Sequence, residues 1–123
     1  MDKVEILWAR EQIRDRLHLY CKGIDRRDYA LVRSCFADDH YHEHGAFKGS
    51  PDDFVAGAAG LLEKIPATHH SITNVHITLS ADGKRARTEA NFVAYHLIEA
   101  GHEEGFAHGE GIGGGTPLYV NCP

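Results

Sequence analysis

The chain has 123 residues, a formal net charge of −5 and 42% hydrophobic residues, which predicts one globular domain with its own core. Its basic residues are scattered or stand beside acids, so the clustered positive charge of a nucleic-acid-binding surface is not indicated. No charged-then-apolar leader opens the sequence and no apolar run is long enough to cross a membrane. The three cysteines have no CxxC spacing and fit neither a disulfide framework nor a thiolate zinc site. We therefore expect a cytoplasmic protein with no nucleic-acid or membrane partner.

The first part of the chain predicts two helices and a strand. Apolar residues recur at helical spacing over residues 4–24, where Asp2 can cap the start and Gly23 stands near the end. A second, shorter helix follows over residues 28–37, and a strand and turn follow over residues 40–49.

The second part predicts one more helix and a long hairpin. Ser50 is a good N-cap, Pro51 suits the first helical position, and Pro66 ends the pattern. Residues 68–101 then alternate as two antiparallel strands around an "ADGK" turn. The order of elements predicts an α+β fold, with helices packed on one face of a mostly antiparallel sheet.

Three histidines alternate in the predicted strand, at His40, His42 and His44. Imidazole is the commonest metal ligand, and alternate side chains of a strand share a face. However, such residues stand about 6–7 Å apart in a row, which suits convergence on one ion poorly. The Asp of an HxHxDH motif is also absent, because Glu43 stands where the spacing breaks. We interpret the segment as a polar strand face without a metal, with His42 or His44 still able to contact a ligand.

The C-terminal stretch "HGEGIGGGTPLYVNCP" has a composition unlike a sheet strand. It contains a GxGxxG spacing at Gly109, Gly111 and Gly114. No helix pattern follows and no βαβ unit surrounds it, so dinucleotide binding is not indicated. No other cofactor is implied either.

Four segments, in this order, resemble the SnoaL-like branch of the nuclear transport factor 2-like (NTF2-like) superfamily. They are "YCKGIDRRDYALVRSCFADD", "FKGSPDDF", "THHSITNV" and "DGKRARTEANFVAYH". The resemblance covers roughly residues 3–110. It implies a cystatin-like cone, in which a curved, mostly antiparallel sheet wraps an apolar cavity and the N-terminal helices pack on its concave face. It also implies a single domain over residues 1–123, with 110–123 as an atypical tail, and a homo-oligomer, either dimer or trimer.

Within this family the chain is most similar to dehydratases and dehydrohalogenases that use an Asp–His pair. Their aspartate lies five residues beyond a tyrosine, as Asp25 does here beyond Tyr20. Their histidine precedes an asparagine by four residues, as His70 precedes Asn74. The resemblance implies that His70 is a general base, Asp25 its orienting carboxylate, and Tyr20 a hydrogen-bond donor in the cavity.

Four further residues are predicted to bind the substrate. Lys22 lies near the same mouth, where its charge could hold an anionic or leaving group. Phe92, His42 and His44 are expected to contact a small hydrophobic molecule.

The physical chemistry of the pair agrees with these roles. Taking a proton from carbon needs a base that titrates near working pH, as histidine does. A carboxylate on the other ring nitrogen fixes the tautomer and stabilises the imidazolium that forms. A closed apolar cavity excludes water and strengthens both interactions.

Each residue also has a purely structural interpretation. Asp25 could cap the helix over 28–37 or form a turn. His70 could be a hydrogen-bonded core histidine, with His69 facing inward instead. Tyr20 on an apolar helix face could belong to the core.

The sequence departs from the family near its C-terminus. Related elimination enzymes carry an arginine on a late strand, and this chain shows none in that pattern after His108. One hypothesis is a truncation or a shift of reading frame near Gly113, and another is a sheet that closes by pairing with a second subunit.

Three functions stay open at this point. The leading one is a small cofactor-independent lyase, or an isomerase of the same fold, that abstracts a proton from a hydrophobic cyclic substrate and expels water or halide. The alternative is a non-catalytic ligand-binding or dimerisation module whose catalytic set has decayed. The third is a metal-dependent hydrolase. The identity of the substrate cannot be derived from the sequence.

Overall fold

The computed structural model describes residues 1–97, 108–113 and 118–121, with side chains described through residue 97. The elements in chain order are α1 (Lys3–Asp25), α2 (Tyr29–Ser34), β1 (His42–His44), β2 (Phe47–Gly49), α3 (Pro51–Leu62), β3 (Ala67–Leu79), β4 (Arg85–Leu97), β5 (His108–Gly113) and β6 (Leu118–Asn121).

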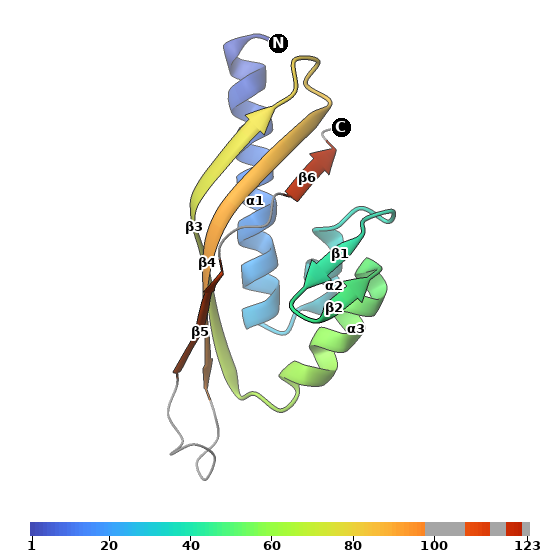
Figure 1. Cartoon of the computed structure of the whole chain (residues 1–123), viewed down its shortest axis with the longest axis vertical. Coiled ribbons are helices and arrows are strands. Elements are labelled where there is room, and N and C mark those ends of the chain that lie inside the picture. Colours follow the sequence, from blue (N-terminus) through green and yellow to red (C-terminus); the bar gives the residue numbers. More distant parts are fainter. Residues whose placement is uncertain (98–107, 114–117, 122–123) are drawn as a thin grey trace.

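The long hairpin of β3 and β4 forms the body of the sheet. Its register runs from Ala67 opposite Leu97 to Leu79 opposite Ala86. β5 pairs with one end of β4 and β6 pairs with the other, both antiparallel, while β1 and β2 form a separate two-stranded sheet. Figure 1 shows the β3–β4 ribbon curving along α1, with α2, α3 and the β1–β2 hairpin on the far side of that helix. The α+β architecture predicted from the sequence is therefore confirmed.

Local signals decide where the helices begin. Asp2 and Glu5 form a reciprocal capping box at the start of α1, each side chain accepting a hydrogen bond from the other residue's backbone N–H at 2.8 Å. At the start of α3, the Ser50 hydroxyl accepts from the Asp53 N–H, and Pro51 occupies the first turn. These caps lie where the sequence predicts them, because capping depends on neighbours in the chain.

Gly23 does not end α1, which continues to Asp25. A Cβ atom on Gly23 would lie 2.7 Å from Cγ2 of Val32, a residue of α2 that is fully buried. Its missing side chain thus lets the last turn of α1 pack closely against α2.

Among residues 1–97, the core consists of two clusters, each of which includes a residue of α1. One lies among the three helices and is centred on Ile24, Val32, Phe54 and Leu62. The other, formed by Ile13, Ile77 and Ala86, lies between the first half of α1 and the β3–β4 hairpin. The first half of α1 thus packs against the sheet, and its last turn packs against the other helices.

A β-bulge interrupts β3 between Thr73 and His76. Asn74 adopts the left-handed backbone conformation there, with φ of 54°. Before the bulge the even-numbered residues are the more buried, and after it the odd-numbered residues are, including Ile77 at 2% exposure. The bulge thus shifts the inward-facing phase of the strand by one residue.

The glycine-rich C-terminal segment takes part in the sheet, although its composition is unlike a strand. Residues of β5 pair with Phe92–His96 of β4, and those of β6 pair with Arg85–Thr88. Backbone hydrogen bonds alone make such pairing possible, because glycine retains its N–H and C=O groups. The rest of the predicted atypical tail, residues 114–117 and 122–123, lies outside the described part of the chain.

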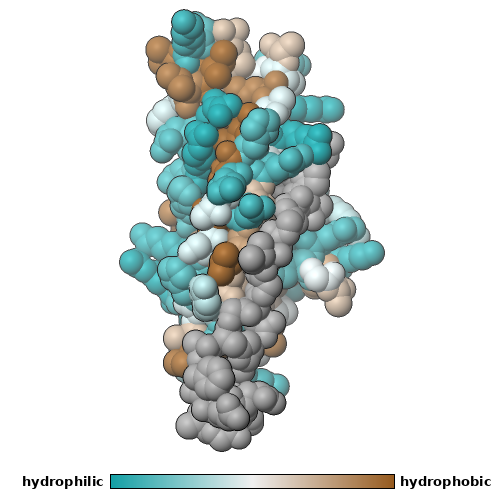
Figure 2. Space-filling view, turned by 60° about the vertical axis from the view of Figure 1, so that its left-hand side comes forward, coloured by the Kyte–Doolittle hydropathy of each residue, from teal (hydrophilic) through white to brown (hydrophobic). Residues whose placement is uncertain are grey.

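The outer surface carries apolar side chains at the end of the molecule where α1 begins (Figure 2). Val4, Leu7 and Trp8 of α1 are 74%, 65% and 61% exposed. In the part of the chain that the structure describes, no helix is both long and apolar enough to span a membrane.

Candidate active site

Asp25 and His70 meet where the end of α1 reaches the beginning of β3. The Asp25 Oδ1 atom lies 2.7 Å from Nδ1 of the His70 ring, and Oδ2 accepts the backbone N–H of His70 at 2.9 Å. A carboxylate only accepts hydrogen bonds, so the ring nitrogen at Nδ1 is the donor. The sequence-predicted pair is thus in direct contact, and each carboxylate oxygen binds the same residue.

The neighbouring residues Asp28 and His69 have other partners, which leaves Asp25 and His70 to pair with each other. Asp28, not Asp25, caps α2, because its carboxylate accepts the Leu31 N–H at 3.1 Å. On β3 the inward phase before the bulge includes His70, whereas His69 is exposed and its ring bonds the Ser71 hydroxyl at 2.8 Å. The capping interpretation of Asp25 and the inward orientation of His69 are both wrong.

The pair is partly buried and still reachable. The His70 side chain is 13% exposed and that of Asp25 is 21% exposed. With Nδ1 bonded to the carboxylate, Nε2 is the ring nitrogen left to exchange a proton with a ligand.

An open pocket of about 450 Å³, called the cavity below, lies against the pair, and its volume is within the size range of small-molecule sites. Its helical wall consists of residues at spacing i, i+3, i+4 and i+7, which share one face of α1. The lining residues are His18, Cys21, Lys22 and Asp25 from α1, and His70, Ser71, Ile72 and Thr73 from β3.

Sequence reasoning missed His96, a neighbour of His70 on the adjacent strand. The two rings lie edge to face, with centroids 5.9 Å apart. In the register of the hairpin, His96 pairs with Thr68 and Ala94 pairs with His70, so both histidines project from the same face. The signal was present in the sequence, but using it requires the register of the hairpin.

The family model of the SnoaL-like domain matches residues 5–113. The chain therefore belongs to the SnoaL-like domain family. No curated protein sequence matches it significantly.

Solved structures share this fold with the SnoaL-like chain. Kfla4162 of Kribbella flavida superposes with a TM-score of 0.72 at 20% identity, over 83% of this chain and 74% of its own. A candidate scytalone dehydratase of Novosphingobium aromaticivorans gives 0.70 at 16% identity, over 80% and 66%. The hexachlorocyclohexane dehydrochlorinase LinA-type3 of Novosphingobium barchaimii gives 0.71 at 14% identity, over 95% and 94%. The NTF2-like cone predicted from the sequence is confirmed, and the named activities belong to those proteins.

Tyr20 belongs to an aromatic cluster beside the cavity. Its ring is stacked on Phe54 at 6.3 Å and meets Phe36 edge to face at 5.9 Å. Burial, with smaller contributions from Cys21, Cys35 and Asp25, raises the pKa of the Tyr20 hydroxyl. The phenol thus remains protonated and able to donate. Among the described residues, Tyr20 is not one of those that line the cavity.

His42 is enclosed by the same cluster. It is 8% exposed, and its ring centroid lies 4.0 Å from that of Phe54. Burial is the main cause that lowers the pKa of His42 to about 4, with His40 and His44 adding to it. The expectation of a polar strand face holds for His44, which is exposed, but not for His42.

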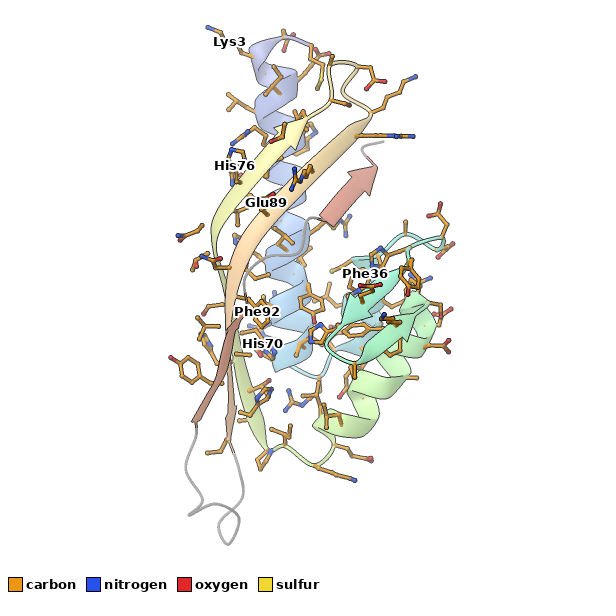
Figure 3. All side chains as sticks on the ribbon, in the orientation of Figure 1. Lys3, Phe36, His70, His76, Glu89 and Phe92 are labelled. Carbon is orange, nitrogen blue, oxygen red and sulfur yellow. The ribbon has the colours of Figure 1, made fainter. Side chains whose placement is uncertain are left out.

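The predicted substrate-binding residues fall into two groups. Lys22 lines the cavity. Phe92 pairs with Ile72 across the hairpin, which puts it on the same sheet face as His70, and both side chains project toward α1 and the β1–β2 hairpin (Figure 3). His42 and His44 contact Phe54 in the aromatic cluster. Burial and, secondarily, the charge of His70 lower the pKa of His44, so His44 lies within electrostatic range of the pair.

Within residues 1–97, no group of three or more His, Cys, Asp or Glu side chains is arranged as a metal site requires. His40 and His42 instead bond each other, with Nε2 of the first 3.0 Å from Nδ1 of the second. The late-strand arginine expected from the family is absent from the sequence, whose last arginine is Arg87.

Proposed function

We propose that this SnoaL-like protein is a small cofactor-independent lyase, or an isomerase of the same kind, in which His70 removes a proton from carbon. The observation that carries the proposal is the 2.7 Å contact between Asp25 Oδ1 and His70 Nδ1 at the wall of a cavity. This arrangement gives a base with a fixed tautomer and an adjacent counter-charge.

The elimination proceeds with a simple balance of atoms. The proton moves from a substrate carbon to Nε2 of His70, and the C–H electron pair forms a C=C bond. The C–X pair leaves with X as halide, and His70 then passes its proton to solvent; where X leaves as hydroxide, it takes that proton from the His70 imidazolium to become water. The imidazolium that forms is stabilised by the Asp25 carboxylate through Nδ1–H.

Two other side chains are assigned to the leaving group. The Lys22 ammonium, on the cavity wall, would stabilise a departing anion. The Tyr20 phenol, protonated because its pKa is raised, would donate a hydrogen bond to the leaving group of a substrate that extends from the cavity to the adjacent aromatic cluster. Both roles place positive charge or a proton where negative charge develops.

The substrate class follows from the walls and the neighbours. Cys21 and Ile72 give the cavity apolar surface beside the charged pair, and Phe92 adds an aromatic ring on the same sheet face. Two proteins of the same fold are named for cyclic substrates, scytalone and hexachlorocyclohexane. A small, hydrophobic cyclic molecule that loses water or halide is the substrate class we propose.

The test uses those two compounds as first probes, with chloride release and dehydration as readouts. We expect turnover of at least one compound by the native protein, and a loss of at least about 100-fold in kcat for Asp25→Asn and His70→Gln. His69→Gln is the matched control, because His69 is an exposed neighbour that bonds only Ser71 among the described residues. Probe binding without turnover, unchanged in both dyad variants, would instead support the non-catalytic binding module.

A further inference from the structure

Arg27, two residues beyond the end of α1, has an unusual backbone. The Arg27 N–H bonds the carbonyl of Ile24 at 3.1 Å and the Asp28 N–H bonds that of Gly23 at 2.8 Å, which together make a Schellman motif. Arg27 occupies the left-handed position of this motif, with φ of 58°, where glycine is the usual residue. A side chain retained at a strained position that favours glycine suggests that the side chain itself is needed.

The Arg27 guanidinium joins three segments of the chain. Nη1 donates to the carbonyl of Ile24 at 2.8 Å and to the Thr68 hydroxyl at 2.9 Å, while Nη2 donates to the carbonyl of Ile65 at 2.8 Å. These acceptors belong to the end of α1, the loop after α3 and the start of β3. The side chain thus fixes the junction at which Asp25 and His70 meet.

The Thr68 hydroxyl connects this junction to the dyad. It lies 3.0 Å from Oδ1 of Asp25 and 2.9 Å from Nη1 of Arg27. A guanidinium has no acceptor, so the hydroxyl accepts from Arg27, and a carboxylate has no donor, so the hydroxyl donates its one proton to Asp25. The direction of every hydrogen bond in the series Arg27, Thr68, Asp25, His70 is therefore determined.

We infer that Arg27 is a positioning residue for the Asp25–His70 pair and acts on it through the Thr68 hydroxyl. The inference rests on the proposed function, because it assigns how the general base is held. Asp25 receives three hydrogen bonds, from the Thr68 hydroxyl and from the ring and backbone N–H of His70. With the hydroxyl oriented by Arg27, the carboxylate cannot rotate away, and Nδ1 keeps its proton while Nε2 stays free for catalysis.

A simpler role would be that Arg27 only clamps the carbonyls of Ile24 and Ile65. That role predicts an effect on stability alone. The relay predicts an additional effect on the ring of His70, and it predicts that this effect depends on the Thr68 hydroxyl.

The test is the tautomer of the His70 ring, read from its ¹⁵N chemical shifts at about pH 8.5, where neutral histidine predominates. The resonances are assigned with His70→Gln. In the native protein and in Thr68→Ser, which keeps the hydroxyl, we expect the Nδ1–H tautomer. In Thr68→Val, which keeps the shape and loses the hydroxyl, and in Arg27→Gly, which keeps the backbone conformation, we expect the Nε2–H form to gain population.

The combination of variants separates the two roles. Adding Arg27→Gly to Thr68→Val should change the tautomer no further, because the relay is already broken. An unchanged His70 tautomer in folded Thr68→Val protein would overturn the inference, and this pair of threonine variants decides the matter even if Arg27→Gly does not fold. With an active substrate, Thr68→Val should also lower kcat by about 10- to 100-fold with little change in KM.

The tautomer can be measured without turnover, so the two proposals fail independently. A tautomer shift in a protein that eliminates neither probe would leave the positioning role in place and remove the lyase assignment. If turnover depends on His70 but the His70 tautomer does not change in the Thr68 variants, the lyase assignment would stand and the positioning role would be wrong.

Discussion

Asn74 determines that His70 and Ile77 face the same side of β3. The residues are an odd number of positions apart, so in a regular strand their side chains would point to opposite faces. The left-handed backbone of Asn74, with φ of 54°, adds one residue at the bulge and brings both to the side of α1. His70 can therefore contact Asp25 while Ile77, 2% exposed, packs in the core with Ile13.

The left-handed backbone at Asn74 predicts that glycine at this position will preserve stability better than a β-branched residue, although β-branched residues usually favour strands. Asn74→Gly should leave the free energy of unfolding nearly unchanged, because glycine adopts positive φ readily. Asn74→Val should lower it by roughly 1–3 kcal/mol, since a β-branched residue is strained there. Urea unfolding of the two variants measures the difference, and equal stabilities would show that the bulge does not depend on this conformation.

A feature can be predicted from the sequence when the residues that form it are close together in the chain. The caps at Asp2 and Ser50 depend on residues three positions away, so the sequence predicts them directly. The pairing of Asp25 with His70 spans 45 positions and came from the family resemblance, not from spacing. Each of these predictions concerned a feature that either a local motif or a whole family specifies.

Other features depended on contacts that no local pattern specifies. His96 lies beside His70 only in the register of the hairpin, which the bulge shifts by one residue along its length. His42 looked polar in its strand, but the packing of α2 and α3 encloses it among phenylalanine rings. The relay through Thr68 was missed because Arg27 reads as one more charge in "DRRD".

A glycine-to-alanine substitution should destabilise the protein at Gly23, where α1 approaches α2 closely, but not at Gly57, where α3 has open space. Gly23→Ala places a Cβ atom 2.7 Å from Val32 Cγ2 and 3.1 Å from the Val32 backbone nitrogen, so the helices must separate. We expect a loss of about 1–3 kcal/mol in the free energy of unfolding. Gly57→Ala on α3 is the control, because its Cβ would meet no atom within 4 Å and alanine favours helix by about 0.5–1 kcal/mol.

Thermal or urea unfolding of both variants provides the comparison. A stable Gly23→Ala protein would mean that the two helices can move apart freely, and the packing explanation for this glycine would be wrong. A destabilised Gly57→Ala protein would indicate a contact on α3 beyond those described.

Tyr20→Phe tests whether the phenol acts in catalysis or only in packing. The ring contacts with Phe36 and Phe54 would remain, so stability should change by less than about 1 kcal/mol. If the hydroxyl donates to the leaving group, kcat should fall by about 100-fold in the elimination assay. An unchanged kcat would assign Tyr20 to the aromatic cluster alone.

The buried ring of His42 predicts that the fold loses stability in mild acid. Burial lowers the pKa of His42 to about 4, below its ordinary value of 6.5, so the unfolded chain takes up a proton that the folded chain resists. This contribution to stability is complete above pH 6.5 and declines as the pH falls toward 4. Replacing the ring by Phe removes the titrating group and keeps the aromatic contact with Phe54.

In urea unfolding, the difference in stability between pH 7 and pH 4.5 should therefore be smaller in His42→Phe than in the native protein, by on the order of 2 kcal/mol. His40 and His44, the titratable groups that contact the His42 ring, have pKa values lowered chiefly by desolvation of the ring nitrogens, even though His44 as a whole residue is exposed, so part of the acid sensitivity should persist in the variant. His69→Gln, at an exposed position, should keep the native pH dependence. If His42→Phe kept it as well, the acid-sensitive group would lie elsewhere, because a histidine that accepts its proton equally in both states contributes no slope.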